Sequence, residues 1–170
     1  MKPHPSEIQR LIDRAAIQDV LTRYFRGIDS ADPEEVRGCF TDDVRAAYDG
    51  RTFIDGIDAL MNAFLAFRNK ASGEWIATTH FMGNLSYVRL DDDIAETETY
   101  AIAFLVTPGA PADKVAMRSL RYLDRLRKAA GAWRICERVH TLDWSCEVPA
   151  SAATSFSARI TRTLPARDGT

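Results

Sequence analysis

The sequence predicts an α+β protein in which N-terminal helices lie against a cone-shaped, curved antiparallel sheet and enclose a pocket. Apolar residues recur every three to four positions over residues 8–28, which is typical of one face of a long helix. Residues 75–144 then read almost entirely as strand, interrupted by turn residues. Helices followed by a run of long strands favour the α+β class over an alternating α/β arrangement. Strands of this length usually curl, and helices on the concave side then close off a cavity.

The long helix is followed by two shorter ones. Gly27 weakens it, and Asp32 and Pro33 end it. Pro33 suits the first position of a second helix over residues 34–40, because the amide hydrogen that proline lacks would be unpaired there, and Asp32 can act as its N-cap. A third helix is expected over residues 57–68, which carry a dense set of large apolar side chains.

Turn signals divide the remainder into hairpins. Asp49-Gly50 is a favoured type I′ pair and predicts a small hairpin over residues 44–54. Ala130-Gly131 marks a longer hairpin over residues 115–144. Residues 94–106 alternate between large and small side chains, which predicts a strand with two different faces.

Composition predicts a single domain of a soluble cytoplasmic protein. The apolar fraction of 46% and the charged fraction of 27% are those of a globular chain. We expect the domain to cover residues 1–147, followed by an extended C-terminal arm or tail over residues 148–170. The formal net charge of -2 argues against nucleic acid as a partner, because a surface that contacts phosphates normally carries a basic excess.

Neither membrane attachment nor metal binding is indicated. No apolar stretch approaches the length that crosses a bilayer, and residues 1–5 lack the apolar core of a signal peptide. The three cysteines are widely spaced and odd in number, so they predict neither a disulfide framework nor a zinc site. No cluster of histidines, cysteines and carboxylates has ligand spacing, and no glycine-rich phosphate loop is present. We therefore expect no cofactor and no metal.

His80 and Asp29 are the first candidates for chemistry. His80 lies in the middle of a predicted strand, where a structural histidine is the ordinary alternative to a general base or acid. Asp29 follows the apolar face near the C-terminal end of the long helix, where carbonyl dipoles and burial disfavour a carboxylate. A buried acid there makes sense if it orients a histidine and stabilises its charged form. The alternative is a solvated aspartate at a helix end.

Two tyrosines and two residues of the last strand could complete a site. Tyr24 belongs to the apolar face of the long helix, yet its hydroxyl needs a partner when buried and can polarise a carbonyl. Tyr48 carries the same ambiguity. Arg138 shares a strand face with His140 and would offer a fixed cation to a carboxylate or a developing oxyanion. Because Arg134 also falls on that face in simple alternation, a solvated outer face is the competing interpretation.

The remaining pocket candidates are mostly apolar. Glu98 lies on the large-residue face of its strand and is a possible second acid. Arginines 118, 121, 125 and 127 are interpreted as the solvated or interface side of their strand. The expected lining of a hydrophobic pocket consists of Phe25, Met61, Phe64, Met82, Phe104 and Trp144.

The pattern resembles the SnoaL-like branch of the nuclear-transport-factor-2-like superfamily. The resemblance covers residues 7–144 and depends on Ala15-Ala16-Ile17-Gln18-Asp19-Val20 leading to Tyr24 and Asp29, on the strand around His80, and on Trp133-Arg134-Ile135 followed by Arg138. Within that superfamily it is most similar to cofactor-free dehydratases and dehydrohalogenases: scytalone dehydratase, bile-acid 7α-dehydratase and hexachlorocyclohexane dehydrochlorinase.

The resemblance implies roles for these residues. Asp29 and His80 match the aspartate–histidine dyad of those enzymes, and Tyr24, Tyr48 and Arg138 match pocket residues of the bile-acid enzyme. It implies an oligomer, a homodimer or homotrimer, which also fits a long antiparallel sheet with one face to cover. The dehydrochlorinase has a lysine before its aspartate, so loss of a hydroxyl fits this chain better than loss of a halide.

The hypothesis is a cofactor-independent lyase that performs dehydratase-type elimination on a hydrophobic cyclic small molecule. Isomerases and polyketide cyclases share the first proton abstraction and are the nearest alternatives. A non-catalytic binding or accessory subunit, such as the small subunit of a ring-hydroxylating dioxygenase, is an alternative of a different class, because fold alone does not decide function.

Overall fold

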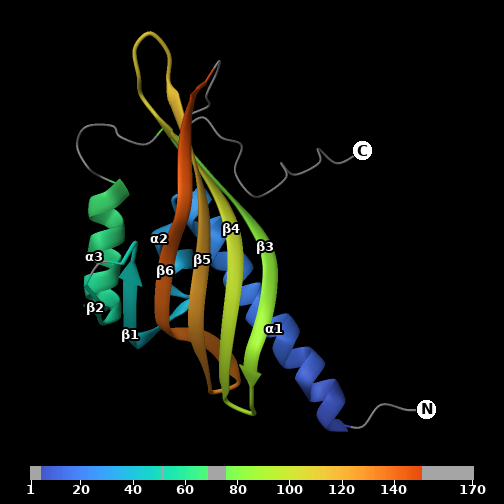
Figure 1. Cartoon of the computed structure of the whole chain (residues 1–170). Coiled ribbons are helices and arrows are strands. Elements are labelled where there is room, and N and C mark those ends of the chain that lie inside the picture. Colours follow the sequence, from blue (N-terminus) through green and yellow to red (C-terminus); the bar gives the residue numbers. More distant parts are fainter. Residues whose placement is uncertain (1–4, 51, 69–75, 151–170) are drawn as a thin grey trace, which may run out of the picture.

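One curved, open sheet and three helices make up the described part of the chain (Figure 1). The computed structural model describes residues 5–50, 52–68 and 76–150. The helices are α1 (Pro5–Asp29), α2 (Pro33–Arg37) and α3 (Ile57–Arg68), and the strands are β1 (Phe40–Tyr48), β2 (Ile54–Asp55), β3 (Ala77–Leu90), β4 (Ile94–Thr107), β5 (Lys114–Ala129) and β6 (Ala132–Pro149). The predicted α+β class is confirmed. The last strand runs past the expected domain boundary at residue 147, and the tail from residue 151 lies outside the described residues.

The sheet has the strand order β2-β1-β6-β5-β4-β3. The strands β3 to β6 pair antiparallel as long hairpins, as expected, but β1 pairs with β6 in parallel. Parallel neighbours need a long connection between them, and here everything from β2 to β5 supplies it. Residues Ala46, Ala47 and Tyr48 lie opposite Arg138, Val139 and His140. This pairing brings the end of β1 beside the middle of β6.

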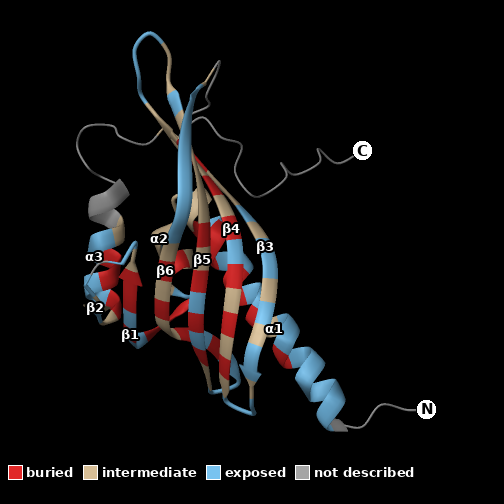
Figure 2. Ribbon diagram, viewed as in Figure 1, coloured by how far each residue is buried: buried red, intermediate tan, exposed pale blue. Residues whose placement is uncertain are grey.

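Only part of the apolar face of α1 is buried. Ile17, Val20 and Leu21 are almost fully buried, whereas Ile8 and Leu11 are 44% and 64% exposed in the turns that run beyond the sheet (Figure 2). Halfway along the helix, the Asp13 carboxylate accepts hydrogen bonds from Lys128 and from the indole of Trp133. These contacts fix α1 against the sheet, so that its C-terminal half carries Tyr24 and Asp29 inward.

The second helix follows α1 closely. The Glu35 amide donates a hydrogen bond of 3.0 Å to Asp32 Oδ1, which confirms the predicted N-cap. The helix ends at Arg37 rather than at residue 40, because Phe40 already belongs to β1. Gly27 permits the contact between the two helices. A Cβ atom built there would lie 2.9 Å from Cγ2 of Val36 and 3.1 Å from its backbone nitrogen.

We expect Gly27→Ala to destabilise the protein by about 1–3 kcal/mol, because the added methyl group forces α2 away from α1. This loss outweighs the gain of up to ~1 kcal/mol that alanine brings to a helix interior. Urea unfolding measures the effect. Gly38→Ala is the matched control, since its Cβ would meet nothing closer than 3.4 Å. Equal stability of the two variants would contradict the prediction.

The two faces of β4 are reversed relative to the sequence prediction of the pocket lining. The small residues point into the concave side and are buried, namely Ala95, Thr97, Thr99, Ala101 and Ala103. A concave face offers less room for each side chain than a convex one, so small residues fit there. Glu98 and Phe104 lie on the outer face, where Glu98 pairs with Arg121 at 3.2 Å and Phe104 packs edge-on against the exposed Phe81. Neither lines the pocket.

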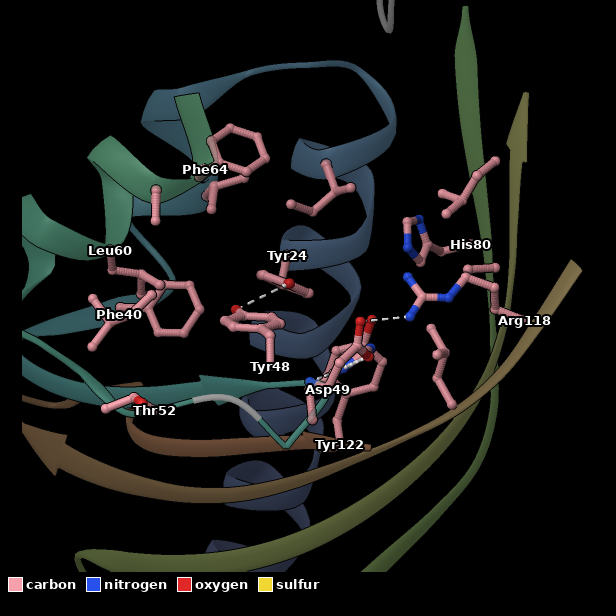
Figure 3. Close-up of a pocket in the computed structure, with 18 residues that line it drawn as sticks. Tyr24, Phe40, Tyr48, Asp49, Thr52, Leu60, Phe64, His80, Arg118 and Tyr122 are labelled. Carbon is pink, nitrogen blue, oxygen red and sulfur yellow. Dashed lines mark hydrogen bonds and ion pairs between the residues drawn. The ribbon is translucent and has the colours of Figure 1, made fainter. Parts of the chain in front are cut away.

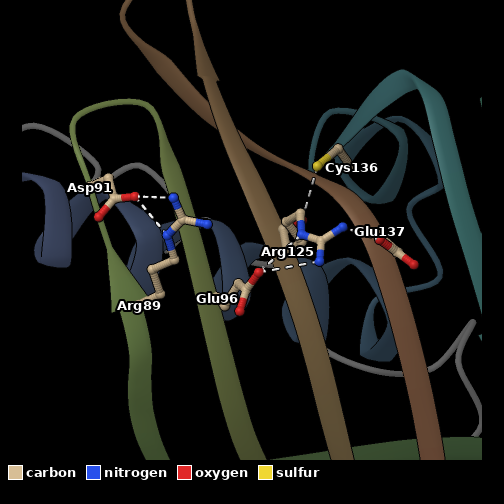
Figure 4. A network of polar contacts seen from close by, with 6 residues as sticks. All are labelled: Arg89, Asp91, Glu96, Arg125, Cys136 and Glu137. Atoms are coloured by element: carbon tan, nitrogen blue, oxygen red, sulfur yellow. Dashed lines mark hydrogen bonds and ion pairs between the residues drawn. The ribbon is translucent and has the colours of Figure 1, made fainter.

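The outer face carries a row of ion pairs across three strands. Arg125 on β5 donates to Glu96 on β4 at 3.2 Å and to Glu137 on β6 at 2.7 Å (Figure 4). Such exposed cross-strand pairs each contribute only about 0–1 kcal/mol. Large apolar side chains are also exposed on the sheet, among them Phe81 and Val88 on β3, Tyr100 on β4 and Trp144 on β6. The homodimer or homotrimer stays a prediction.

Candidate active site

A cavity of about 230 Å³ lies between the C-terminal half of α1, the segment from β1 to α3, and the concave side of the sheet (Figure 3). Most of its lining is apolar or aromatic, with a few polar groups, as small-molecule sites usually are. The lining residues are Tyr24, Ile28, Val36, Phe40, Tyr48, Asp49, Thr52, Ile54, Leu60, Ala63, Phe64, His80, Ala103, Leu105, Arg118, Leu120, Tyr122 and His140.

The structure brings Asp29 and His80 into direct contact. Asp29 is the last residue of α1, and His80 points inward from β3 opposite Ala103. His80 Nδ1 lies 2.7 Å from Asp29 Oδ1, the His80 amide donates to Oδ2 at 2.7 Å, and the Thr78 hydroxyl donates to Oδ1 at 2.9 Å. The two side chains are only 8% and 16% exposed for His80 and Asp29. The predicted pair is thus held by three hydrogen bonds.

These contacts fix the tautomer of His80. Burial raises the pKa of Asp29, but the hydrogen bonds and charge of His80 and the hydroxyl of Thr78 outweigh it and leave the pKa below its ordinary value. An ionised carboxylate can only accept hydrogen bonds, so Nδ1 of His80 carries the proton. In the uncharged form of the ring, Nε2 has a free lone pair, and it makes no hydrogen bond to any residue that the structure describes. His80 lines the cavity, and Phe25 stacks on its ring at 5.6 Å.

Tyr24 and Tyr48 meet in the lining of the cavity. Their hydroxyl oxygens are 3.3 Å apart (Figure 3). Tyr24 is almost fully buried, and burial raises its pKa well above the ordinary value, with Tyr48 and Tyr122 adding to the effect. Tyr24 therefore stays protonated at neutral pH and serves as a hydrogen-bond donor rather than as a strong acid.

Arg138 does not line the cavity, contrary to the sequence prediction. It is fully buried and forms a two-pronged ion pair with Asp124, in which both nitrogen–oxygen distances are 2.7 Å. Its guanidinium lies over the rings of Tyr24 and Tyr122, at 4.0 and 4.7 Å from their centroids. Arg138 therefore supports these tyrosines from behind and cannot reach a ligand in front of them.

A bulge explains why Arg138 points inward while Arg134 is exposed. Ile135 pairs with Leu126 and Glu137 with Arg125, so Cys136 is an extra residue in β6. The extra residue reverses the alternation of the strand at that point. Arg134 therefore faces solvent, and Arg138 and His140 face the core.

Arg118, Asp49 and His140 form a second polar cluster in the cavity, and the sequence did not predict that these three residues would meet. Arg118 Nη2 lies 2.7 Å from Asp49 Oδ2, and Asp49 Oδ1 lies 3.0 Å from Nδ1 of His140. All three residues line the cavity. Arg118 shares the inward face of β5 with Leu120 and Tyr122, which are buried. Simple alternation from those apolar residues is the signal that separates it from the outward Arg121 and Arg125.

His140 should make stability fall in acid. Burial lowers its pKa from the ordinary 6.5 to about 4, with Arg118 and Arg138 contributing and Asp49 opposing. Between these values the unfolded chain binds a proton that the folded protein does not. The stabilisation is complete above pH 6.5 and is lost as the pH falls toward 4, at about 1.4 kcal/mol per pH unit. Denaturant unfolding from pH 7 to 4.5 should show a shallower dependence for His140→Gln, and an unchanged slope would contradict this.

The other predicted pocket residues divide between the cavity and the core. Phe64 lines the cavity, as expected. Phe25 lies behind His80, Met82 packs against the core, and Met61 faces a separate surface hollow beside α2. Trp144 is 50% exposed on the distal part of β6, away from the cavity.

No group of three or more histidine, cysteine, aspartate and glutamate side chains in the described ranges is arranged to hold a metal ion. Of the helices in those ranges, none combines the length and apolar character needed to cross a membrane.

The chain has the nuclear-transport-factor-2-like, cystatin-like fold, in which helices lie over a curved sheet. The chain belongs to the SnoaL-like domain family, whose model matches residues 9–139. The resemblance seen in the sequence is thereby confirmed.

Three solved structures illustrate the similarity. A Mycobacterium tuberculosis protein of unknown function is 31% identical, covering 82% of this chain and 76% of that one, with a TM-score of 0.68. A scytalone dehydratase-like protein from Novosphingobium aromaticivorans is 19% identical over 88% and 96% of the two chains, with a TM-score of 0.73. The hexachlorocyclohexane dehydrochlorinase LinA-type3 from Novosphingobium barchaimii is 17% identical over 87% and 97%, with a TM-score of 0.69. At the two lower identities the likeness concerns the fold.

Proposed function

We propose that this protein is a cofactor-independent lyase that removes water from a hydrophobic cyclic small molecule by general acid–base catalysis. The observation that carries the proposal is the placement of His80. Its Nδ1 is held by the Asp29 carboxylate at 2.7 Å, while its ring lines an apolar cavity. A neutral imidazole fixed in this way presents a basic Nε2 to whatever the cavity binds.

The reaction begins with transfer of a proton from a substrate carbon to Nε2 of His80. The imidazolium that forms is stabilised by Asp29, whose lowered pKa keeps it ionised. The electron pair of the broken C–H bond forms a C=C double bond as a neighbouring C–O bond breaks. The leaving hydroxide takes the proton from His80 and departs as water, so the enzyme returns to its starting state.

The tyrosines are better suited to hydrogen bonding than to proton transfer. Burial raises the pKa of Tyr24 well above its ordinary value, so its phenol releases a proton less readily than an imidazolium does. Tyr24 and Tyr48 therefore hold a substrate oxygen or the leaving hydroxyl in place. This assignment replaces the role first predicted for Arg138, which lies behind Tyr24.

The family and its structural relatives support an enzyme acting on small molecules, and the names of two relatives describe eliminations. An isomerase or cyclase would use the same first step and differs in its products. The accessory-subunit alternative predicts co-purification with a large partner, which a pull-down would detect. The intact, buried Asp29–His80 contact favours catalysis over that alternative.

The test is turnover of a panel of bicyclic and aromatic β-hydroxy ketones by the purified protein. Loss of water gives a conjugated enone, which absorbs strongly, and mass spectrometry separates elimination from isomerisation. Formation of an enone would support the lyase, and a product of unchanged mass would point to an isomerase.

We expect turnover to be unaffected by a chelator, because His80 supplies the base without a metal. The assay is repeated after incubation and dialysis with EDTA. Loss of activity that added zinc or magnesium restores would contradict the metal-independent mechanism.

A further inference from the structure

His80 and Arg118 lie in one row across the sheet, with a small residue between them. His80 pairs with Ala103 on β4, and Ala103 pairs with Arg118 on β5. Neighbouring strands are about 4.8 Å apart, so the two backbones are separated by roughly 10 Å. All three residues line the cavity, and Ala103 is nearly fully buried. Ala103 contributes only a methyl group to this row, and Figure 3 shows the ring of His80 and the guanidinium of Arg118 on the same side of the cavity.

Arg118 has N–H groups that remain available for hydrogen bonds to a ligand. Its one polar contact among the described residues is the 2.7 Å hydrogen bond from Nη2 to Asp49, although a guanidinium carries five N–H donors. Its side chain is 18% exposed, and it is the one permanently cationic residue of the described lining. Arg138 differs in its position, because it is fully buried behind the tyrosines, where Nε and Nη2 bind Asp124 and Nη1, which has no partner among the described residues, does not reach the cavity.

We infer that Arg118 is the oxygen-binding residue of the cavity and that the substrate is a cyclic β-hydroxy ketone whose carbonyl lies over Ala103. This inference rests on the proposed function, since it assigns the group that activates the C–H bond broken by His80. A carbonyl in that place has its oxygen toward Arg118 and its α-carbon toward Nε2 of His80.

The chemistry balances without an added reagent. The α-proton moves to Nε2, and the electron pair of the C–H bond shifts so that the carbonyl becomes an enolate. Arg118 stabilises the negative oxygen through charge-assisted hydrogen bonds in a cavity lined mostly by apolar and aromatic side chains. The enolate then re-forms the carbonyl, the C=C bond forms, and the β-hydroxide leaves with the proton from His80.

Asp49 offsets part of the positive charge of Arg118. Its carboxylate spans Arg118 and His140, at 2.7 and 3.0 Å. A partner that offsets part of the Arg118 charge disfavours the permanent binding of anions, while a developing oxyanion still gains from the unused donors. Removing this partner should therefore strengthen the binding of a preformed anion.

The test measures binding, so that it does not depend on turnover. The probes are 4-nitrophenolate, which presents an oxyanion on a small ring, and nitrobenzene, which has the ring without that oxygen. We expect Arg118→Met to weaken 4-nitrophenolate binding by about 10- to 100-fold in an absorbance titration, as fits the loss of charged hydrogen bonds. Nitrobenzene binding should change little. Asp49→Asn should bind 4-nitrophenolate more tightly, and Arg118→Lys should retain part of the affinity.

Arg121→Met is the matched control, because Arg121 lies on the outer face of the same strand and pairs with Glu98 and Asp143. It should bind both probes as the wild type does. Equal 4-nitrophenolate affinity in Arg118→Met, or an equal loss of both probes, would overturn the inference. Arg118-dependent binding without dehydration of any β-hydroxy ketone would count against the lyase alone. Dehydration with binding indifferent to Arg118 would count against the oxygen subsite alone.

Discussion

His80→Ala is expected to lower turnover by about 10²–10⁴-fold while leaving a folded protein, because it removes the one group that accepts the substrate proton. Among the described residues, the ring contacts Asp29 and the stacked Phe25. The rate of enone formation measures the loss, and circular dichroism with thermal unfolding confirms the fold. Full activity in a folded His80→Ala protein would end the acid–base mechanism.

Asp29→Asn should lower turnover to a similar degree by a different route. The amide cannot stabilise the charged form of His80, and it can present a donor to Nδ1 and so select the wrong tautomer. Thr78→Val is the matched control, since it removes one hydrogen bond to Asp29 and leaves the contact with His80. We expect a much smaller loss for that variant. Equal losses in Asp29→Asn and Thr78→Val would point to disturbed packing rather than to the histidine.

Asp124→Ala is expected to cost about 3–5 kcal/mol in the free energy of unfolding, because it leaves the Arg138 charge buried without its partner. Both side chains are fully buried. Burial lowers the pKa of Arg138, but Asp124 and the surrounding hydroxyls raise it well above the ordinary value, so the residue stays charged. Guanidinium chloride unfolding measures the loss. A surface pair such as Arg127 with Asp43 gives the control, where truncation should cost at most about 1 kcal/mol.

The double variant Asp124→Leu with Arg138→Met separates a structural role from a catalytic one. Apolar residues of similar volume can replace a buried ion pair at little cost, so the double variant should recover much of the stability that Asp124→Ala loses. Because Arg138 contacts the ring of Tyr24 from behind, turnover should largely survive. A stable double variant without turnover would restore Arg138 to the catalytic site.

The sequence predicted the helical part of the site well, because local signals determine it. The periodic apolar face and the Asp32 cap place the end of α1, and with it Asp29, close to the sheet. The position of His80 within a strand was equally readable. The contact between Asp29 and His80 was inferred from family resemblance, since local sequence patterns do not determine which side chain an inward-pointing histidine will contact.

The strand faces were harder to predict, because alternation does not say which of the two faces is buried, and a bulge interrupts it. In β4 the large residues were expected inside, yet the concave side accepts the alanines and threonines and leaves Phe104 and Glu98 outside. In β6 the extra residue Cys136 reverses the pattern. Arg118 was assigned to solvent together with its outward neighbours, although Leu120 and Tyr122 on its own face mark that face as buried. As a result, the sequence placed Arg138 in the cavity, whereas the structure places Arg118 there.

The parallel pairing of β1 with β6 places one wall of the cavity on a different part of the chain from the Asp29–His80 pair. Asp29 and His80 belong to the longest helix and to a hairpin strand, whose positions many hydrogen bonds determine. The opposite wall comes from one continuous stretch, residues 48–64, which joins the main sheet through the short contact of β1 with β6. Substitutions in that stretch can reshape the binding space without moving the acid–base pair. Under the proposed function, such substitutions change which substrates fit the cavity while Asp29 and His80 keep their contact.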